Sequence, residues 1–136
     1  MSTPALVQSF YDRIWNAGDE TAATTLLTGD FAFRGSLGMT TRGHEPFLDY
    51  VRPVRNSLGR YHCEILACVA EGDRAFAQMK FSGSHVAPFR GYPPTGRPVY
   101  WHGAALFSFH SGLITELWVL GDLAGLDELL RTNARS

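Results

Sequence analysis

A chain of 136 residues, of which 45% are hydrophobic and 18% charged, fits one globular domain over residues 1–136 with ample core material. Its formal net charge is −1, and no block of basic residues favours a nucleic acid or an anionic membrane as partner. No stretch approaches the roughly 18 apolar residues that a membrane span needs, and the N-terminus lacks the pattern of a signal peptide. We therefore expect a cytoplasmic protein.

The N-terminal third carries helical patterns. Apolar residues at the i, i+3, i+4, i+7 spacing predict a first amphipathic helix, namely Val7, Phe10, Tyr11, Ile14 and Trp15. Pro4 suits its first turn and Gly18 its end. Asp19 is a favourable cap for a second helix that runs to Leu27 and stops at Gly29.

A short strand is predicted at 31–33, followed by a loop over 35–43. A third helix is expected to begin near Glu45, with Phe47, Leu48 and Val51 on its inner face. Pro53 should kink or end this helix, because proline lacks the amide hydrogen that a helix interior uses.

Strand patterns dominate from residue 60 onward. Residues 61–70 and 74–82 predict a hairpin about the turn at 71–73, and residues 99–110 and 113–121 predict another about Ser111-Gly112. The proline- and glycine-rich segment 83–98 reads as a long loop, and a short helix should run from Asp122 to about Arg131.

The two cysteines, Cys63 and Cys68, are five residues apart on a predicted strand. Side chains alternate along a strand, so an odd separation sends them to opposite faces. We expect neither a local disulfide nor a shared metal.

Helices followed by a meander of antiparallel strands predict an α+β architecture in which about three N-terminal helices pack on one face of a curved sheet. Curvature of the sheet would leave a pocket between the two layers.

Several segments resemble the SnoaL-like polyketide cyclases and their ester cyclase relatives, in the expected order over nearly the whole chain. They are Phe10-Tyr11 with Ile14-Trp15-Asn16-Ala17-Gly18-Asp19, Gly83-Ser84-His85, Gly91-Tyr92-Pro93-Pro94-Thr95-Gly96, Val99-Tyr100-Trp101, and Glu116-Leu117-Trp118 with Asp122-Leu123-Ala124-Gly125-Leu126. The resemblance implies the cone-shaped, nuclear transport factor 2-like fold, often a homodimer, and ring closure by aldol chemistry without metal or cofactor. The same superfamily includes isomerases, dehydratases, epoxide hydrolases and non-enzymatic pocket proteins, so the fold alone does not choose among them.

Asp122 is the first candidate catalytic residue. In the cyclases that the chain resembles, an aspartate four residues after a tryptophan serves as the acid/base, and Asp122 lies four residues after Trp118. Strand alternation places Asp122 on the same face as Trp118. Burial at the mouth of an apolar pocket would raise its pKa towards the range of a general base. The alternative is a helix N-cap, a position that aspartate favours.

Two histidines are further catalytic candidates. His85 precedes the Pro/Gly loop and either contacts substrate at the pocket rim or makes a turn hydrogen bond. His102 follows Trp101 and faces the opposite side of its strand, where a dimer surface is one expectation, unless a bulge reverses the alternation. His44, His62 and His110 are expected to be exposed.

Aromatic side chains from separate elements suit a pocket for a small, planar, apolar or aromatic substrate. The candidates for this lining are Tyr11, Trp15, Phe33, Phe47, Trp101, Phe107 and Trp118. Tyr11 could also donate a hydrogen bond to a carbonyl or enolate oxygen; the alternative is a hydroxyl that reaches the surface.

The sequence therefore predicts a cofactor-free enzyme acting by proton transfer on a carbonyl compound, and the alternative is a carrier of small hydrophobic molecules. No zinc-ligand spacing, dinucleotide fingerprint or nucleophile elbow occurs, so we expect no metal and no cofactor. A third hypothesis, epoxide hydrolysis, would need an Asp-Arg-Asp set drawn from Asp49, Arg52, Asp73 and Arg74.

Overall fold

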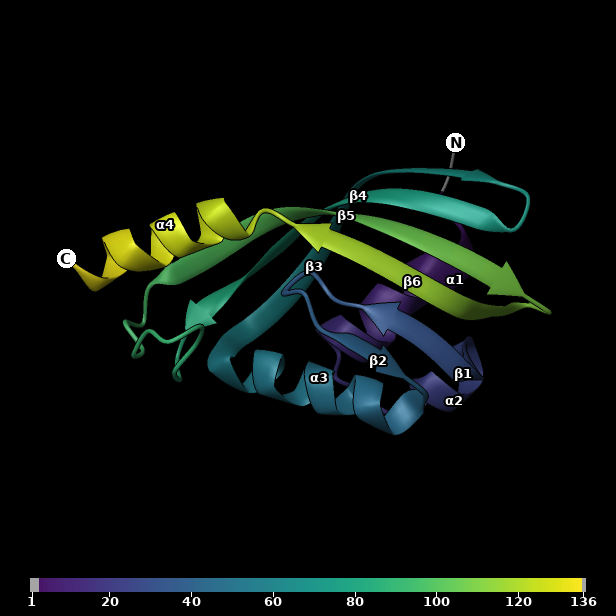
Figure 1. Ribbon diagram of the computed structural model, residues 1–136, viewed down its shortest axis with the longest axis horizontal. Coiled ribbons are helices and arrows are strands. Elements are labelled where there is room, and N and C mark those ends of the chain that lie inside the picture. Colours follow the sequence, from purple (N-terminus) through teal and green to yellow (C-terminus); the bar gives the residue numbers. More distant parts are fainter. Residues whose placement is uncertain (1–2, 136) are drawn as a thin grey trace.

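The computed structural model describes residues 3–135 as one six-stranded sheet with helices packed against it (Figure 1). The elements in chain order are α1 (Ala5–Ser9), the π-helical η1 (Phe10–Asn16), α2 (Ala22–Leu26), β1 (Leu27–Arg34), β2 (Thr40–Arg42), α3 (His44–Ser57), β3 (Leu58–Glu71), β4 (Arg74–His85), β5 (Pro98–His110), β6 (Leu113–Gly121) and α4 (Leu123–Ala134). The α+β class predicted from the sequence is confirmed.

The strands lie in the order β2-β1-β6-β5-β4-β3. Both predicted hairpins, β3–β4 and β5–β6, are present, and β4 and β5 also pair along their length. The sheet is antiparallel except between β1 and β6, which run parallel. β1 therefore lies between its own successor β2 and the last strand of the chain, β6.

The helical region differs from the prediction in three ways. The first helix is not uniformly α-helical, because α1 gives way to the wider turns of η1 at Phe10. The second begins only at Ala22, and the Asp19 carboxylate instead accepts hydrogen bonds from the Thr21 backbone and hydroxyl. The third runs through Pro53 without ending. The buried side chains of Val51 and Val54 hold the turns on either side of that proline against the core.

The strands are longer than their apolar patterns suggest. β1 starts at Leu27, and the segment expected to be a loop contains the edge strand β2. The Pro/Gly-rich loop is shorter than predicted, because β4 extends to His85 and β5 starts at Pro98. The last helix continues to Ala134. The strand ends are extended by pairing to a neighbouring strand. A local sequence pattern does not contain that pairing.

A bulge in β3 changes the faces of the two cysteines. Ile65 pairs with Met79 and Ala67 with Gln78, so Leu66 is an extra residue and the alternation reverses after it. Cys63 is buried, and Cys68 also packs against the core, although partly exposed. The prediction of opposite faces was therefore wrong, and both thiols are free.

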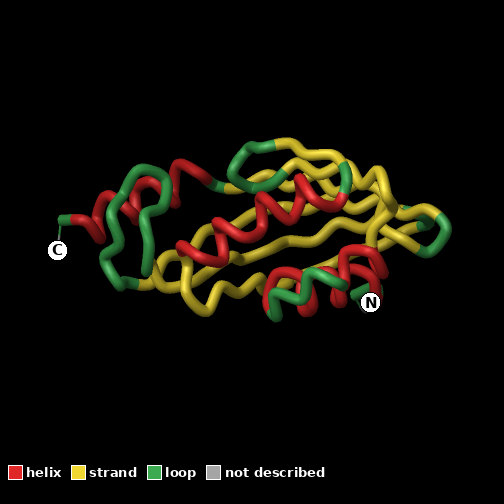
Figure 2. The backbone as a smooth tube through the Cα atoms, turned by 90° about the horizontal axis from the view of Figure 1, so that it is seen from below, coloured by secondary structure: helices red, strands yellow, loops and turns green. Residues whose placement is uncertain are grey.

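The helices α1, η1, α2 and α3 cover one face of the sheet, and α4 extends beyond its end, with the two termini at opposite ends of the molecule (Figures 1 and 2). Phenylalanine rings join the layers. Phe47 of α3 lies with its ring centroid 5.9 Å from Phe10 and 5.2 Å from Phe31, and Phe10 lies 5.7 Å from Phe107 of β5. This cluster packs between the two layers and adjoins the candidate site through Phe33, whose ring centroid lies 4.8 Å from that of Phe47.

Candidate functional site: an aromatic chamber between helices and sheet

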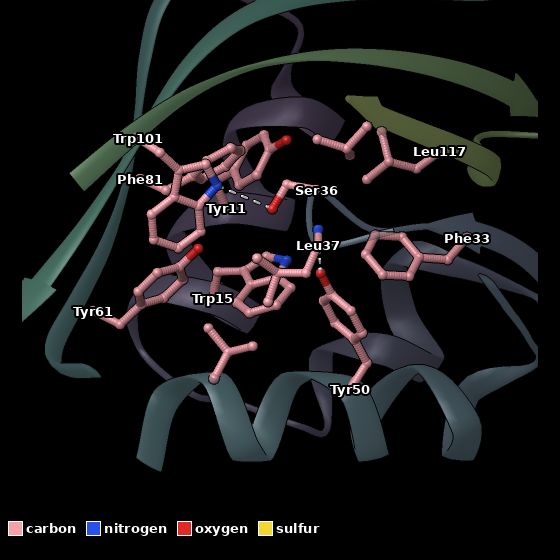
Figure 3. Close-up of a pocket in the computed structure, with 12 residues that line it drawn as sticks. Tyr11, Trp15, Phe33, Ser36, Leu37, Tyr50, Tyr61, Phe81, Trp101 and Leu117 are labelled. Atoms are coloured by element: carbon pink, nitrogen blue, oxygen red, sulfur yellow. Dashed lines mark hydrogen bonds between the residues drawn. The ribbon is translucent and has the colours of Figure 1, made fainter. Parts of the chain in front are cut away.

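A small chamber lies between the helices and the covered face of the sheet (Figure 3). Its volume is about 20 Å³, roughly the space that one water molecule needs. The lining residues come from η1, the loop 35–39, α3 and five strands: Tyr11, Trp15, Phe33, Ser36, Leu37, Tyr50, Val54, Tyr61, Phe81, Trp101, Leu117 and Val119. The walls are thus largely aromatic, with a few hydroxyl groups as polar contacts.

The π-helical turn of η1 directs Tyr11 and Trp15 into this chamber. Both side chains are buried, together with Phe10 and Ile14 from the same seven residues. Short π-helical segments inside helices are rare and occur frequently at functional sites. The four buried residues are those that the apolar spacing of the sequence placed on one face of the first helix.

The Tyr11 hydroxyl is the unusual polar group of the chamber. It is buried and has no hydrogen-bond partner among residues 3–135. Burial, and then the nearby Cys63 and Cys68, raise the pKa of Tyr11 well above its usual range. The hydroxyl therefore keeps its proton at physiological pH, and it can donate a hydrogen bond to a ligand oxygen.

Two pairs of other polar groups in the chamber bond to each other. Trp101 Nε1 donates to Ser36 Oγ at 3.3 Å, and the Leu37 amide donates to the Tyr50 hydroxyl oxygen at 3.1 Å (Figure 3). The loop carrying Ser36 can approach this closely because Gly121 has no side chain, and a Cβ there would lie 2.8 Å from the Ser36 carbonyl oxygen. Burial raises the pKa values of Tyr50 and Tyr61 as well, so they too stay protonated.

Four of the seven predicted lining residues lie in the chamber, namely Tyr11, Trp15, Phe33 and Trp101. Phe47 and Phe107 are buried in the adjoining phenylalanine cluster instead.

Trp118 points the other way. It is 43% exposed on the uncovered face of the sheet, beneath the guanidinium group of Arg34. Its neighbours in β6, Leu117 and Val119, face inward in its place. Alternation in β6 was predicted correctly, but the sequence did not indicate which of its two apolar faces is covered.

The same alternation governs Asp122. It shares the outward parity of Trp118, is exposed, and accepts a hydrogen bond from the Gly125 amide at 2.9 Å as the N-cap of α4. Of the two readings that the sequence left open, the geometry matches the N-cap, and the carboxylate is not among the groups lining the chamber.

The two candidate histidines lie on opposite faces of the sheet. His102 is exposed on the uncovered face, with its ring 6.2 Å from that of Tyr100. His85 is completely buried on the covered face, and neither of its ring nitrogens has a hydrogen-bond partner in the part of the chain that the structure describes. Its ring lies 6.3 Å from Phe89, which in turn lies 6.0 Å from Trp101 of the chamber wall.

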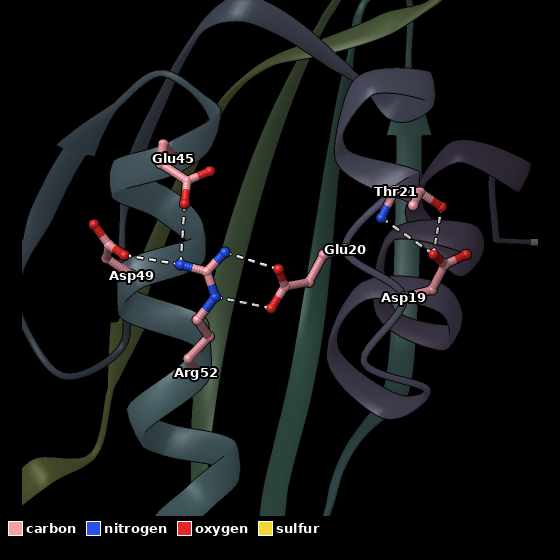
Figure 4. Close-up of polar contacts among 6 residues, drawn as sticks. All are labelled: Asp19, Glu20, Thr21, Glu45, Asp49 and Arg52. Atoms are coloured by element: carbon pink, nitrogen blue, oxygen red, sulfur yellow. Dashed lines mark hydrogen bonds and ion pairs between the residues drawn. The ribbon is translucent and has the colours of Figure 1, made fainter.

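The Asp-Arg-Asp set considered for epoxide hydrolysis is not assembled in the chamber. Arg52 does pair with Asp49 at 2.9 Å, but it also pairs with Glu20 at 2.8 Å and Glu45 at 3.1 Å, all on the exposed side of α3 (Figure 4). Asp73 and Arg74 lie at the distant β3–β4 turn. The Arg52 group links α3 to the segment before α2 and has no contact with the chamber.

Sequence analysis missed eight lining residues. Two signals could have found some of them: Tyr50 and Val54 continue the inner face of α3 defined by Phe47 and Val51, and Phe81 shares the inward parity of Met79. The loop residues Ser36 and Leu37 carry no periodic signal at all. Their place depends on the close contact at Gly121, which is remote in sequence.

A helical layer over a curved sheet, with an aromatic chamber between them, defines an α+β protein of the small-molecule pocket class. The chain belongs to the SnoaL-like polyketide cyclase family, whose model matches residues 5–128. No curated protein matches the sequence.

Solved structures share the fold over almost the whole chain. TsrD from Streptomyces laurentii is 27% identical, with 96% of this chain and 98% of that one covered and a TM-score of 0.80. A provisionally assigned polyketide cyclase from Acidithiobacillus ferrooxidans is 20% identical, with 98% and 100% covered and a TM-score of 0.86. A protein of ketosteroid isomerase-like fold from Catenulispora acidiphila is 20% identical, with 92% and 91% covered and a TM-score of 0.76. The expected nuclear transport factor 2-like fold is thereby confirmed.

Proposed function

We propose that this protein binds a small planar carbonyl compound in the chamber and promotes cofactor-free proton transfer on it, as in a cyclase, isomerase or dehydratase. The observation that carries the proposal is the buried Tyr11 hydroxyl, which has no partner in the described chain and belongs to a side chain that lines an aromatic chamber. An unpaired buried hydroxyl costs about 1–3 kcal/mol. A substrate oxygen that accepts its hydrogen bond would remove that cost.

In the proposed reaction Tyr11 supplies electrophilic stabilisation. Removal of a proton from the carbon beside a carbonyl leaves negative charge on the oxygen, and a protonated, desolvated hydroxyl donates to that oxygen most strongly when the charge has developed. The enolate carbon then takes up a proton in an isomerisation, or attacks a second carbonyl carbon in a ring closure. Tyr11 keeps its own proton throughout, consistent with its raised pKa.

We propose His85 as the proton acceptor. It is the candidate base that lies on the covered face of the sheet, and its ring nitrogens are unpaired among residues 3–135. Phe89 contacts both His85 and the chamber residue Trp101, so a shift of this ring would give the imidazole access to a ligand. A neutral imidazole accepts a proton at one nitrogen and can return it to the product.

The test is deuterium uptake at the α-carbon of 2-tetralone in D₂O, followed by proton NMR. Wild type should exchange faster than buffer. Tyr11→Phe should lower the rate by about 10²–10³-fold, and His85→Gln by about 10²–10⁴-fold. Asp122→Asn is the matched carboxylate control, and it should leave the rate unchanged. Unchanged exchange in both Tyr11→Phe and His85→Gln would overturn the proposal.

The second candidate function is a non-catalytic carrier of the same kind of molecule. It is favoured by the absence of any carboxylate or imidazole from the chamber lining of the described chain. In this case 2-tetralone would quench the fluorescence of Trp15 and Trp101 on binding but would exchange no faster than in buffer.

We also propose that two copies pair through the uncovered face of the sheet. Phe76, Leu106 and Trp118 lie opposite one another on β4, β5 and β6 and form a row across the sheet. Phe76 and Trp118 are each 43% exposed, and Leu120 beside them is 50% exposed. Contiguous exposed apolar side chains of this kind mark interaction surfaces.

A further inference from the structure

A second, larger hollow lies directly outside the chamber. It is a groove of about 360 Å³ between α3 and two loops, within the range of about 300–1,000 Å³ that small-molecule sites occupy. We call it the outer groove, and its lining residues are Leu37, Met39, Asp49, Tyr50, Pro53, Val54, Ser57, Pro88, Phe89 and Arg90. In the empty protein the chamber has room for about one water molecule, so a ring can enter it only when the shared wall described next is displaced.

The chamber and the outer groove share one wall. Leu37, Tyr50 and Val54 line both spaces, the first from the loop 35–39 and the other two from α3. The loop is tied to the helix at this wall by the hydrogen bond from the Leu37 amide to the Tyr50 hydroxyl, drawn in Figure 3. Displacing the Leu37 side chain would therefore join the two spaces without moving a strand of the sheet.

The outer groove offers an apolar surface. Its polar groups are engaged elsewhere: Arg90 pairs with Asp127 at 2.8 Å, Asp49 pairs with Arg52 at 2.9 Å, and the Ser57 hydroxyl donates to the Pro88 carbonyl at 2.9 Å. What remains towards the groove is mostly hydrocarbon and ring, including the exposed side chain of Met39. A charged or strongly polar occupant would find no free partner there.

We propose that the chamber and the outer groove form a single binding site for an amphiphilic molecule, with an oxygen-bearing ring at Tyr11 and an uncharged hydrocarbon tail in the groove. This inference rests on the proposed function for the position of the ring and adds the class of substrate. The ring oxygen accepts a hydrogen bond from the Tyr11 hydroxyl, which is unpaired in the described part of the chain. The tail covers the apolar groove walls, and Leu37 separates the two compartments in the empty protein.

The experiment uses phenol, 4-butylphenol and 4-octylphenol as probes on the full-length protein, with quenching of tryptophan fluorescence as the readout. Each methylene that enters the groove should tighten binding by on the order of fourfold, so affinity should rise steeply from phenol to 4-butylphenol. Equal affinity for all three phenols would overturn the proposal.

Two surface variants locate the tail. Met39→Glu places a charge in the groove, and Val86→Glu places the same charge at an exposed apolar residue that does not line it. Met39→Glu should weaken 4-octylphenol at least tenfold and leave phenol unchanged, whereas Val86→Glu should change neither. If the two variants behave alike, the tail lies elsewhere.

Tyr11→Phe separates this inference from the proposed function. It should weaken all three phenols by the same factor. If Tyr11→Phe has no effect while Met39→Glu removes the dependence on chain length, the groove assignment stands and the role of Tyr11 fails. If Tyr11→Phe weakens phenol but chain length has no effect, the proposed function stands and the groove assignment fails.

Discussion

The Tyr11 hydroxyl is buried without a hydrogen-bond partner among residues 3–135, and this makes the residue a test of whether the chamber serves stability or binding. Replacing it with phenylalanine removes an unpaired polar group and keeps the ring, whose centroid lies 5.0 Å from that of Phe10. We expect Tyr11→Phe to leave the free energy of unfolding unchanged or raise it by about 1 kcal/mol. Urea denaturation measures this; a loss above about 1 kcal/mol would indicate a structural hydrogen bond instead.

Variants of Asp122 separate its helix-capping role from a catalytic role. Because asparagine caps helices about as well as aspartate, Asp122→Asn should preserve stability, whereas Asp122→Ala should lower it by about 0.5–2 kcal/mol. The exposed N-cap bond to Gly125 is the physical reason. Thermal unfolding of both variants checks the expectation. A stable Asp122→Asn protein that no longer exchanges 2-tetralone would restore a catalytic role for the carboxylate.

Three buried acids make stability fall at high pH. Burial raises the pKa values of Tyr11 and Tyr61 above their usual 10.0, and that of the Cys63 thiol above its usual 9.0. The unfolded chain therefore loses these protons at lower pH than the folded protein does. The stabilisation of the folded state by the three groups is complete below about pH 9 and is lost as the pH rises above that. Each group can contribute a slope of up to about 1.4 kcal/mol per pH unit.

The measurement is urea denaturation at about pH 8 and about pH 10.5. Tyr61→Phe should reduce the difference in unfolding free energy between the two conditions, and the exposed Tyr100→Phe should not. An identical difference in wild type and Tyr61→Phe would show that Tyr61 titrates alike in both states.

At the scale of residues, the alternation of side chains along β5 and β6 was predictable from the sequence, but which face of the sheet the helices cover was not. Trp101 and His102 do face opposite sides as predicted, and Trp118 and Asp122 do share a side. The side they share faces away from the helices, because β6 is apolar on both faces and only the packing of Leu117 and Val119 against the helical layer decides between them.

At the scale of elements, regular segments were predictable and irregular ones were not. The periodicities of α3, β3–β4 and β5–β6 mark them clearly. The π-helical turn of η1, the bulge at Leu66 and the edge strand β2 depend on contacts between segments far apart in sequence. The irregular elements shape the site, since η1 supplies Tyr11 and the loop before β2 supplies Leu37.

An ion pair attaches the loop 86–97 to α4. Arg90 contacts both carboxylate oxygens of Asp127, at 2.8 and 3.0 Å, and holds the pKa of that carboxyl below its usual range. Since the pair is partly exposed, Arg90→Gln should lower global stability by less than about 1 kcal/mol.

Arg90→Gln should nevertheless speed amide hydrogen exchange across the loop 86–97, including the amide of Phe89 beside the outer groove. Asp127→Asn should have the same effect, and Arg97→Gln, on the same loop but in none of the ion pairs found in the described chain, should not. Unaltered exchange in both Arg90→Gln and Asp127→Asn would mean that packing of Phe89, rather than the ion pair, fixes the loop.

At the scale of the whole molecule, the helical layer covers one face of the sheet and leaves the other open, although both faces carry apolar residues. The order of helices and strands in the sequence predicted the covered face. The family resemblance predicted a homodimer, and the open apolar face favours such a pairing. The row formed by Phe76, Leu106 and Trp118 has no cover within the described chain. Among the described residues, no helix is long and apolar enough to cross a membrane.

The proposed pairing makes the open face a quantitative prediction. A stable homodimer buries roughly 800 Å² per partner, and at about 25 cal/mol per Å² of apolar area a central tryptophan is a major contributor. Trp118→Glu should therefore convert a dimer to a monomer in sedimentation equilibrium at micromolar concentration, and Met39→Glu, also at an exposed apolar residue but in the outer groove, should not. Because the chamber lies on the other side of the sheet, the monomeric Trp118→Glu protein should still bind phenol. A wild-type protein that sediments as a monomer would leave this face without a second copy as its partner.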